Sequence, residues 1–355
     1  MYRKLITACA ACACASSAFA QSSVTLSGIV DVAVRRGEGE GSGKLSSVVS
    51  GSNSTSRLIF SGREDLGSGL SAGFHLETGL LADSGANASA DKFFDRRSTV
   101  SLASTTWGEA RLGRDFVPSY TVWSRHDPFA YVGVGRTANL VSATPVGPIR
   151  SAFGANPNTT VRSDNAGQYI LPAGLGGFEG ALMIAPGEGR DVTTGRASLT
   201  GVRVGHTGQA FAVSAATTLS ENSQTTASKF RDSVVGGQVD IGNVKVSAAV
   251  RQFKYGQAKQ TLALLGATAV WGPHEVKASW VRANLSGRVG ATAIDANDAD
   301  QLGIGYVYNF SKRTAVYTTF ARLSNDGAAR FLVDGPAPVA GGSSKGFEVG
   351  VRHRF

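Results

Sequence analysis

One serine of the chain has the spacing that many hydrolases use for a nucleophile. Ser71 lies in the sequence Gly69-Leu70-Ser71-Ala72-Gly73, which matches the G-x-S-x-G pattern. That pattern presents the serine hydroxyl on a sharp turn between a strand and a helix. No helical period follows Ser71, because the residues after it alternate as a strand does. In a chain with 45 glycines such a match is expected by chance, so no catalytic residue is predicted.

The histidines and cysteines do not have the spacing of a metal site. The five histidines include no His-x-x-x-His pair, and the three cysteines, at positions 9, 12 and 14, all lie near the amino terminus. There a basic start, a short apolar run and small residues predict a signal peptide, residues 1–20, cut between Ala20 and Gln21. The mature chain, residues 21–355, would then contain no cysteine. We expect no metal and no cofactor. The acidic run at Asp295 to Asp300 could hold calcium, but it lacks the Gly and the final Glu of a calcium loop, which favours a solvated acidic loop.

Charge is the strongest chemical signal in the sequence. The formal net charge is +9, without a compact run of lysine and arginine. An exported chain with this pattern is not expected to bind nucleic acid, and small anions or lipopolysaccharide phosphates are its expected partners. The segment 116–161 contains Arg125, Arg136 and Arg150 but only one acid, Asp127.

The elements that carry these charges are short strands. From residue 23 onward, segments of about ten residues alternate apolar with small or polar side chains, as at Leu302, Ile304 and Tyr306. Seven short breaks alternate with eight long polar ones, which predicts sixteen strands. No later stretch has the roughly 18 apolar residues of a membrane helix. The pattern therefore predicts an all-β fold, a 16-stranded antiparallel transmembrane β-barrel with short periplasmic turns and long external loops.

The last ten residues, 346–355, show the two faces of such a strand. Phe347, Val349 and Val351 lie on one face with the terminal Phe355, and Glu348 and the last two arginines lie on the other. A soluble β-sheet protein seldom ends on an apolar strand that closes with an aromatic residue. We expect the apolar face to contact lipid and the charged face to line an aqueous lumen.

The same alternation assigns a direction to some arginines. Leu58 and Phe60 face outward, so Arg57 faces the lumen. Arg96 and Arg97 are adjacent and should point to opposite faces, and the parity of Val100 with Leu102 favours Arg97 as the lumenal one. Arg114 shares the outer face with Leu112, where lipid exposure would cost a few kcal/mol near the midplane. Burial against a partner subunit avoids that cost, which makes Arg114 a candidate trimer contact; the alternative is a rim position from which it reaches the headgroups.

Several segments resemble the general porins of Gram-negative bacteria, in particular the beta-proteobacterial trimeric type. The matches occur in family order along nearly the whole mature chain and include SSVTLSGIVDVAV (22–34), SRLIFSGREDLGSGL (56–70), RLGRDFVPSY (111–120) and the ending GVRHRF (350–355). Ser27 departs from the family, which usually has an aromatic residue there. The resemblance implies a homotrimer in the cell outer membrane that passes small hydrophilic solutes passively, with the long third loop folded into the lumen.

The resemblance also implies roles for single residues. Arg162 resembles a lumenal arginine of the family, and the pattern Phe94-x-Arg96 favours Arg96 over Arg97, so the predicted constriction wall consists of Arg57, Arg96 and Arg162. From the loop we expect Arg125, Arg136 and Asp127 at the constriction. The result is a positive neck that prefers anions and also admits neutral solutes; the alternative is that these arginines only brace the loop. Phe355 resembles the family's signal for the barrel-assembly machinery.

Two other classes of function remain as alternatives at this level. A secreted β-rich adhesin or structural protein is also rich in glycine and short strands, and extraction in water without detergent would identify it. An outer-membrane barrel hydrolase would use Ser71, and an esterase activity that is lost in Ser71→Ala would reveal it.

Overall fold

The computed structural model describes residues 23–142, 147–154, 157–187 and 197–355. The predicted signal peptide, residues 1–20, lies outside the described residues. None of the helices in the described part of the chain is both long and apolar enough to cross a bilayer.

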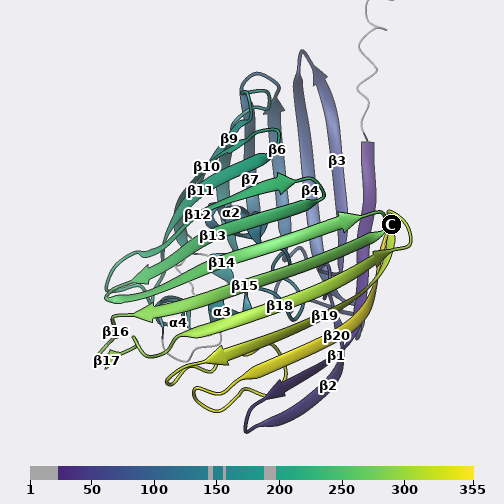
Figure 1. Ribbon diagram of the computed structural model, residues 1–355. Coiled ribbons are helices and arrows are strands. Elements are labelled where there is room, and N and C mark those ends of the chain that lie inside the picture. The colour runs from purple at the N-terminus through teal and green to yellow at the C-terminus, as the bar shows by residue number, and fades with distance from the viewer. Residues whose placement is uncertain (1–22, 143–146, 155–156, 188–196) are drawn as a thin grey trace, which may run out of the picture.

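Antiparallel strands form one large sheet that curves around a central space (Figure 1). Eighteen strands belong to it, of which two do not cross on their own: β2 (Gly43–Ser50) continues into β3 after a break, and β5 (Ala86–Asn87) has two residues. The sixteen that remain (18 − 2) are β1 (Ser23–Gly39), β3 (Arg57–Gly67), β4 (Leu70–Leu81), β6 (Arg97–Ser104), β7 (Gly108–Phe116), β8 (Arg162–Ile170), β9 (Phe178–Ala185), β10 (Ser198–Thr207), β11 (Phe211–Glu221), β12 (Phe230–Ile241), β13 (Val244–Tyr255), β14 (Ala258–Trp271), β15 (His274–Ser286), β18 (Ala299–Asn309), β19 (Thr314–Asn325) and β20 (Ser344–Arg354). A separate hairpin, β16 (Arg288–Val289) with β17 (Thr292–Ala293), lies between β15 and β18.

The first and last strands close the sheet into a barrel. β1 pairs with β20 from Ile29 opposite Arg354 to Gly39 opposite Ser344, and on its other side with β3. At the end of this seam Gly28 and Phe355 exchange two backbone hydrogen bonds of 3.1 Å. This pairing joins the two ends of the sheet, and it confirms the predicted 16-stranded antiparallel barrel.

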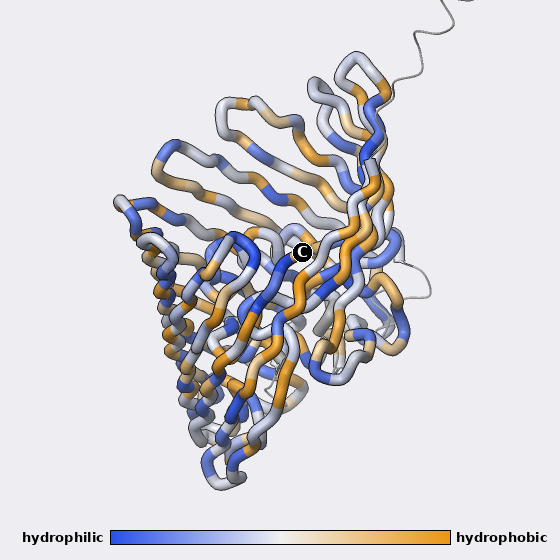
Figure 2. The backbone as a smooth tube through the Cα atoms, turned by 90° about the vertical axis from the view of Figure 1, so that its right-hand side faces the viewer, coloured by the Kyte–Doolittle hydropathy of each residue, from blue (hydrophilic) through white to orange (hydrophobic). Residues whose placement is uncertain are grey.

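The side chains alternate as the sequence predicts, with apolar residues outside and polar ones inside. On β13, Val246 and Val250 are exposed on the outer face, whereas Ser247 and Arg251 are buried on the inner face. Figure 2 shows this alternation as orange and blue segments along the strands. On β20 the outward row of Phe347, Val349 and Val351 is exposed as predicted, and Glu348 is buried inside. A barrel with this exterior fits a hydrocarbon environment.

One predicted long break is short in the structure. The sequence predicts a long loop from residue 256 to 260, but β14 already begins at Ala258 and pairs with β13 up to Tyr255. Gly256 provides the positive φ of 55° that this tight turn needs. The polar residues Lys259 and Gln260 imitate a loop in the sequence although they belong to the strand.

The described residues between β7 and β8 (117–142, 147–154 and 157–161) lie on the inner side of the barrel wall, and we call them the loop segment. It contains α2 (Pro118–His126), α3 (Asn139–Ser142), α4 (Pro148–Phe153) and the 3₁₀ turn η2 (Pro157–Thr160). The Ser119 hydroxyl donates to Asp232 of β12 over 2.6 Å, and the Val134 N–H donates to Glu348 of β20 over 3.2 Å. These inward-facing partners belong to strands far apart around the barrel, so the loop segment crosses its interior.

Candidate functional site

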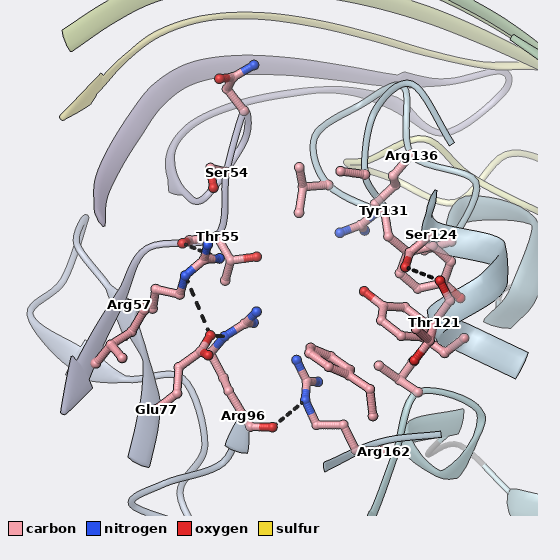
Figure 3. Close-up of a pocket in the computed structure, with 18 of the residues that line it drawn as sticks. Ser54, Thr55, Arg57, Glu77, Arg96, Thr121, Ser124, Tyr131, Arg136 and Arg162 are labelled. Atoms are coloured by element: carbon pink, nitrogen blue, oxygen red, sulfur yellow. Dashed lines mark hydrogen bonds and ion pairs between the residues drawn. The ribbon is translucent and has the colours of Figure 1, made fainter. Parts of the chain in front are cut away.

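A cavity of about 740 Å³ lies between the loop segment and the wall formed by β3, β4 and β8. Its charged lining consists of Arg57, Arg96, Arg136, Arg162 and Glu77, together with His75. With histidine neutral, the formal charge of the lining is +3 (four arginines minus one glutamate). Figure 3 shows Arg57, Glu77 and Arg96 on one side of the space and Thr121, Ser124 and Tyr131 of the loop segment on the other.

Glu77 organises the wall side of the cavity. It lies on the inner face of β4, opposite Ile59 of β3, and is almost fully buried. One carboxylate oxygen accepts a hydrogen bond of 2.5 Å from Nε of Arg96 and lies 3.5 Å from Nε of Arg57, and the other lies 3.1 Å from Nε2 of His75. One buried carboxylate thus holds two guanidinium groups next to each other, which would otherwise repel. Sequence reasoning missed Glu77, although its parity with His75 places it on the inner face.

Arg162 is fixed by backbone and aromatic contacts. As the first residue of β8 it donates from Nε to the Arg96 carbonyl over 2.9 Å, and its guanidinium carbon lies 4.6 Å above the Phe116 ring. Phe116 stacks on Tyr120 with ring centroids 5.0 Å apart, and Tyr120 meets Tyr131 edge to face at 5.2 Å. The aromatic contacts keep the cation in place without neutralising its charge.

The expectation that Arg96 and Arg97 point to opposite faces is wrong. Arg96 lines the cavity, while Arg97 lies beside a second inner cavity and is 3.5 Å from Asp115. Strict alternation holds only within a strand. β6 begins at Arg97, so Arg96 lies in the preceding bend and is free to turn inward.

The loop segment brings one of its predicted charged residues to the cavity and directs two elsewhere. Arg136 lines the cavity and donates from Nε to the Asn139 side chain over 2.8 Å. Burial lowers the pKa of the Arg136 guanidinium from its ordinary value, and the nearby charge of Arg35 adds to this effect.

Asp127 and Arg125 do not line this cavity. The buried Asp127 carboxylate accepts hydrogen bonds from the N–H groups of Phe129 and Tyr131, at 2.9 and 3.1 Å, and from the Thr137 hydroxyl at 2.8 Å. Burial raises the pKa of the Asp127 carboxyl group above its ordinary value. Arg125 forms an ion pair with Glu179 of β9 and lies beside another cavity. The number of charges in a loop can be read from the sequence, but not the direction in which each side chain points.

A network on β1 that sequence reasoning missed shapes the rim of the cavity. Asp31 accepts backbone hydrogen bonds of 2.7 to 3.1 Å from Ser52, Asn53 and Ser54, which turns the break between β2 and β3 inward. Nearby, Arg35 forms an ion pair of 2.8 Å with Glu348. Asp31 and Arg35 lie on the inner face of β1, opposite in direction to the exposed Val30 and Val34. This alternation was the signal in the sequence that could have revealed them.

Arg114 does not need a partner subunit to be buried. It shares the outer side with Leu112 as predicted, yet only 7% of its surface is exposed, because Asp164 of the same chain forms an ion pair with it. Its Nε also donates to the Asp95 carbonyl over 2.6 Å. The irregular register between β7 and β8 brings Asp164 to it. The carboxylate partner of Arg114 therefore lies within the chain, and the burial argument for a trimer contact no longer holds.

Two other residues of interest have ordinary structural surroundings. Ser71 is buried within β4, opposite Ala103 of β6, and not on a strand-to-helix turn. In the acidic run, Asp298 and Asp300 lie 3.5 and 3.4 Å from the Arg282 guanidinium. Phe355, by contrast, packs its ring over Gly28 at the barrel seam.

Comparisons with known proteins agree with this geometry. A family model described as Gram-negative porin matches residues 7–328. The chain is 36% identical to outer membrane porin protein 32 of Delftia acidovorans over 371 residues, which cover 99% of this chain and all of the relative, and 26% identical over its whole length to an outer membrane porin protein of Bordetella pertussis. The structure of the anion-selective porin from Comamonas acidovorans matches with a TM-score of 0.79 and 32% identity over 94% of this chain and all of that one. The trimer form of OmpT from Vibrio cholerae matches with a TM-score of 0.63 over 94% of this chain and 99% of that one, and at 15% identity it shares the fold alone.

Proposed function

The chain belongs to the Gram-negative porin family, and from this premise we propose that its arginine-lined cavity is the constriction of an anion-preferring channel. The protein is an outer-membrane porin of the Gram-negative type, a passive channel and not an enzyme. The observation that carries the proposal is the charge of the cavity, where four arginines face one glutamate.

The physical basis of the preference is incomplete hydration in a narrow space. An ion that passes the cavity loses part of its water, so fixed charges act on it through a lower effective dielectric constant than in bulk water. A net positive lining attracts anions and repels cations, whereas neutral hydrophilic solutes pass if they are small enough. The solutes that fit this site are small inorganic and organic anions, with small neutral molecules as the second class. The similarity to the Comamonas acidovorans protein, which is an anion-selective porin, supports the same proposal.

Reversal potentials measured in planar bilayers under a gradient of potassium chloride test the proposal directly. We expect a potential of the sign that chloride permeation produces. A cation-selective potential at neutral pH would overturn it.

We propose that the protein assembles as a homotrimer, as the resemblance to trimeric porins implies, and the trimer form of the Vibrio cholerae protein supports this. Light scattering of the detergent-solubilised protein would give the mass of three chains, and a monomer of full channel activity would contradict the proposal. Because Arg114 is paired within its own chain, Arg114→Ala should leave the trimer intact.

We propose that lipopolysaccharide phosphates bind a basic row on the outer face, formed by Arg231, Lys254 and Lys259. These exposed side chains lie directly opposite one another on β12, β13 and β14, and among the described residues none of them has a carboxylate partner. Like charges in opposite positions destabilise a sheet, and an anion from the lipid would relieve the repulsion. Replacing all three by Gln should lower the lipopolysaccharide that co-purifies with the barrel, while Gln at Lys312 and Arg313, in a turn at the opposite end, should not.

Two further proposals concern export and assembly. Residues 1–20 act as a signal peptide, so that amino-terminal sequencing of the mature protein should begin at Gln21. Phe355 is recognised by the barrel-assembly machinery, and its position at the seam beside Gly28 supports a role in closure.

A further inference from the structure

Glycines of the barrel wall lie at successive points where the loop segment approaches it. The contacts follow one another around the barrel, from β10 to β20, as the loop segment advances from residue 118 to 134. The pairs are Gly201 of β10 with Pro118, Gly236 of β12 with His126, Gly266 of β14 with Pro128, Gly303 of β18 with Phe129, and Gly346 of β20 with Val134. We call these five glycines the glycine track.

Strands between those of the track contribute hydroxyl groups at similar positions. On β11, the Thr218 hydroxyl donates to the Ser119 hydroxyl over 3.1 Å, and the Ser214 hydroxyl lies 3.0 Å from Nε2 of His126. On β13, the Ser247 hydroxyl donates to the His126 carbonyl over 2.8 Å. The loop segment therefore lies close to glycines on one set of wall strands and forms hydrogen bonds with hydroxyl groups on the strands between them.

Helix α2 lies between this wall and the cavity. Ser119 and His126 are buried against the wall, where they contact Asp232 and Ser214. Tyr120, Thr121 and Ser124 line the cavity on the other side. Anything that separates α2 and the residues after it from the wall must therefore move them toward Arg57 and Arg96 across the cavity.

We propose that the glycine track sets the bore of the channel. Its glycines are positioning residues that touch no solute, and they let the loop segment lie close enough to the wall to leave the cavity open. The proposal rests on the channel function proposed above and adds that the size limit for solutes is determined behind the loop segment, on the wall.

The available space at the track leaves no room for a methyl group. A Cβ at Gly266 would lie 2.5 Å from Cγ of Pro128, and one at Gly201 would lie 2.9 Å from Cγ of Pro118. Ordinary contacts begin at about 3.4 Å, so either the wall or the loop segment must move. The wall strands are hydrogen-bonded to neighbours on both sides, and packed interiors transmit such strain to their less constrained neighbours. The loop segment moves, and the cavity narrows.

The test compares Gly266→Ala with two matched glycine-to-alanine controls in the full-length protein. Gly237→Ala adds a methyl group on the outer face of β12, next to Gly236, where the nearest atom is 3.4 Å away. Gly73→Ala adds one on the inner face of β4, which is outside the track and whose nearest atom is 3.3 Å away. The measurements are single-channel conductance in planar bilayers and liposome swelling with neutral sugars of graded size.

We expect a loss of conductance and a smaller size limit for sugars in Gly266→Ala, and wild-type values in both controls. Adding Pro128→Ala removes the two ring atoms that lie 2.5 and 2.8 Å from the new Cβ and leaves the Ser247 hydroxyl at 2.8 Å, so it should restore most of both quantities. This rescue separates a steric effect from a folding defect.

Wild-type conductance and size limit in Gly266→Ala would overturn the proposal, and so would an increase in either quantity or a failure of Pro128→Ala to restore them. Because the sugars are uncharged, the size limit does not depend on ion preference. A cation-selective wild-type protein would refute the proposed anion preference, but it would not change how the sugar size limit of Gly266→Ala tests the glycine track.

Discussion

Removing one charge from the cavity should reduce the anion preference without disturbing the barrel. Arg162→Gln is the most informative change, because glutamine retains a polar group that can donate to the Arg96 carbonyl, where Nε of Arg162 donates now over 2.9 Å. The change lowers the formal charge of the cavity lining from +3 to +2.

The size of the effect follows from Coulomb's law. A unit charge about 6 Å from the ion path contributes roughly 0.7 kcal/mol in a medium as polar as bulk water, which is about a three-fold change in the local concentration of an ion. Anions and cations change in opposite directions, so the ratio of their permeabilities should fall by about ten-fold, and by more where the cavity is less polar than bulk water. Salt at 1 M reduces the screening length to about 3 Å, so the measurement belongs at about 0.1 M, where that length is roughly 10 Å.

The assay is the reversal potential in a three-fold potassium chloride gradient, with Arg36→Gln as the control. Arg36 is exposed on the outer side of β1, so the control removes the same charge away from the lumen. Equal reversal potentials for Arg162→Gln and wild type would refute the assignment of Arg162 to the ion path. An equal reduction in both variants would show that only the total charge of the chain matters.

Three further predictions follow from single contacts. Glu77→Gln raises the formal charge of the cavity lining from +3 to +4 and should increase the ratio of anion to cation permeability by about ten-fold on the same Coulomb estimate. An unchanged or lower ratio would mean that the hydrogen bond by which Glu77 positions Arg96 matters more than the charge of Glu77. Burial, aided by the Arg125 charge, lowers the pKa of His126 to about 4. Docking of the loop segment on the wall should therefore be unaffected above pH ~6.5 and should weaken by up to about 3 kcal/mol as the pH falls toward 4. Transient closures should then appear in single-channel records below pH ~5 and be absent in His126→Gln. Deleting Phe355 should lower the yield of heat-modifiable barrel several-fold in cells while the molecules that do assemble conduct normally, and reduced conductance at full yield would contradict this.

The alternation of side chains made most of the barrel predictable. Strands such as β13 and β20 have one apolar and one polar face because lipid and water lie on opposite sides of the single-layered barrel wall. This constraint produces an alternation of apolar and polar residues that is visible in the sequence. The same parity placed Arg57 correctly on the inner face, where it lines the cavity. The number of strands was also predictable, since each polar break separates two crossings of the membrane. This holds even at Gly256, where the turn is shorter than the loop that the sequence predicts.

Parity ceased to help wherever the chain leaves a regular strand. Arg96 precedes β6 and Arg114 lies at the irregular register between β7 and β8, so neither has its partner fixed by alternation. The partner of Arg114 is Asp164, fifty residues away, and the partners of Arg96 include Glu77, nineteen residues away. Such pairs depend on how strands neighbour one another in space, which a single sequence does not encode locally.

The charge of the cavity lining depends on where the charged side chains lie, and not on how many of them the loop segment contains. Asp127 receives four hydrogen bonds inside the loop segment, and Arg125 is paired with Glu179 on β9. Within the described residues, Arg136 and Arg162 instead have amide, carbonyl and aromatic neighbours, which hold a guanidinium group without cancelling its charge. In the cavity, Glu77 offsets one of the two charges of Arg57 and Arg96, and Arg136 and Arg162 add two more positive charges. Asp127 and Arg125 lie outside this lining. A porin of the same total charge, with its acids turned inward and its arginines paired behind them, would select cations through the same fold.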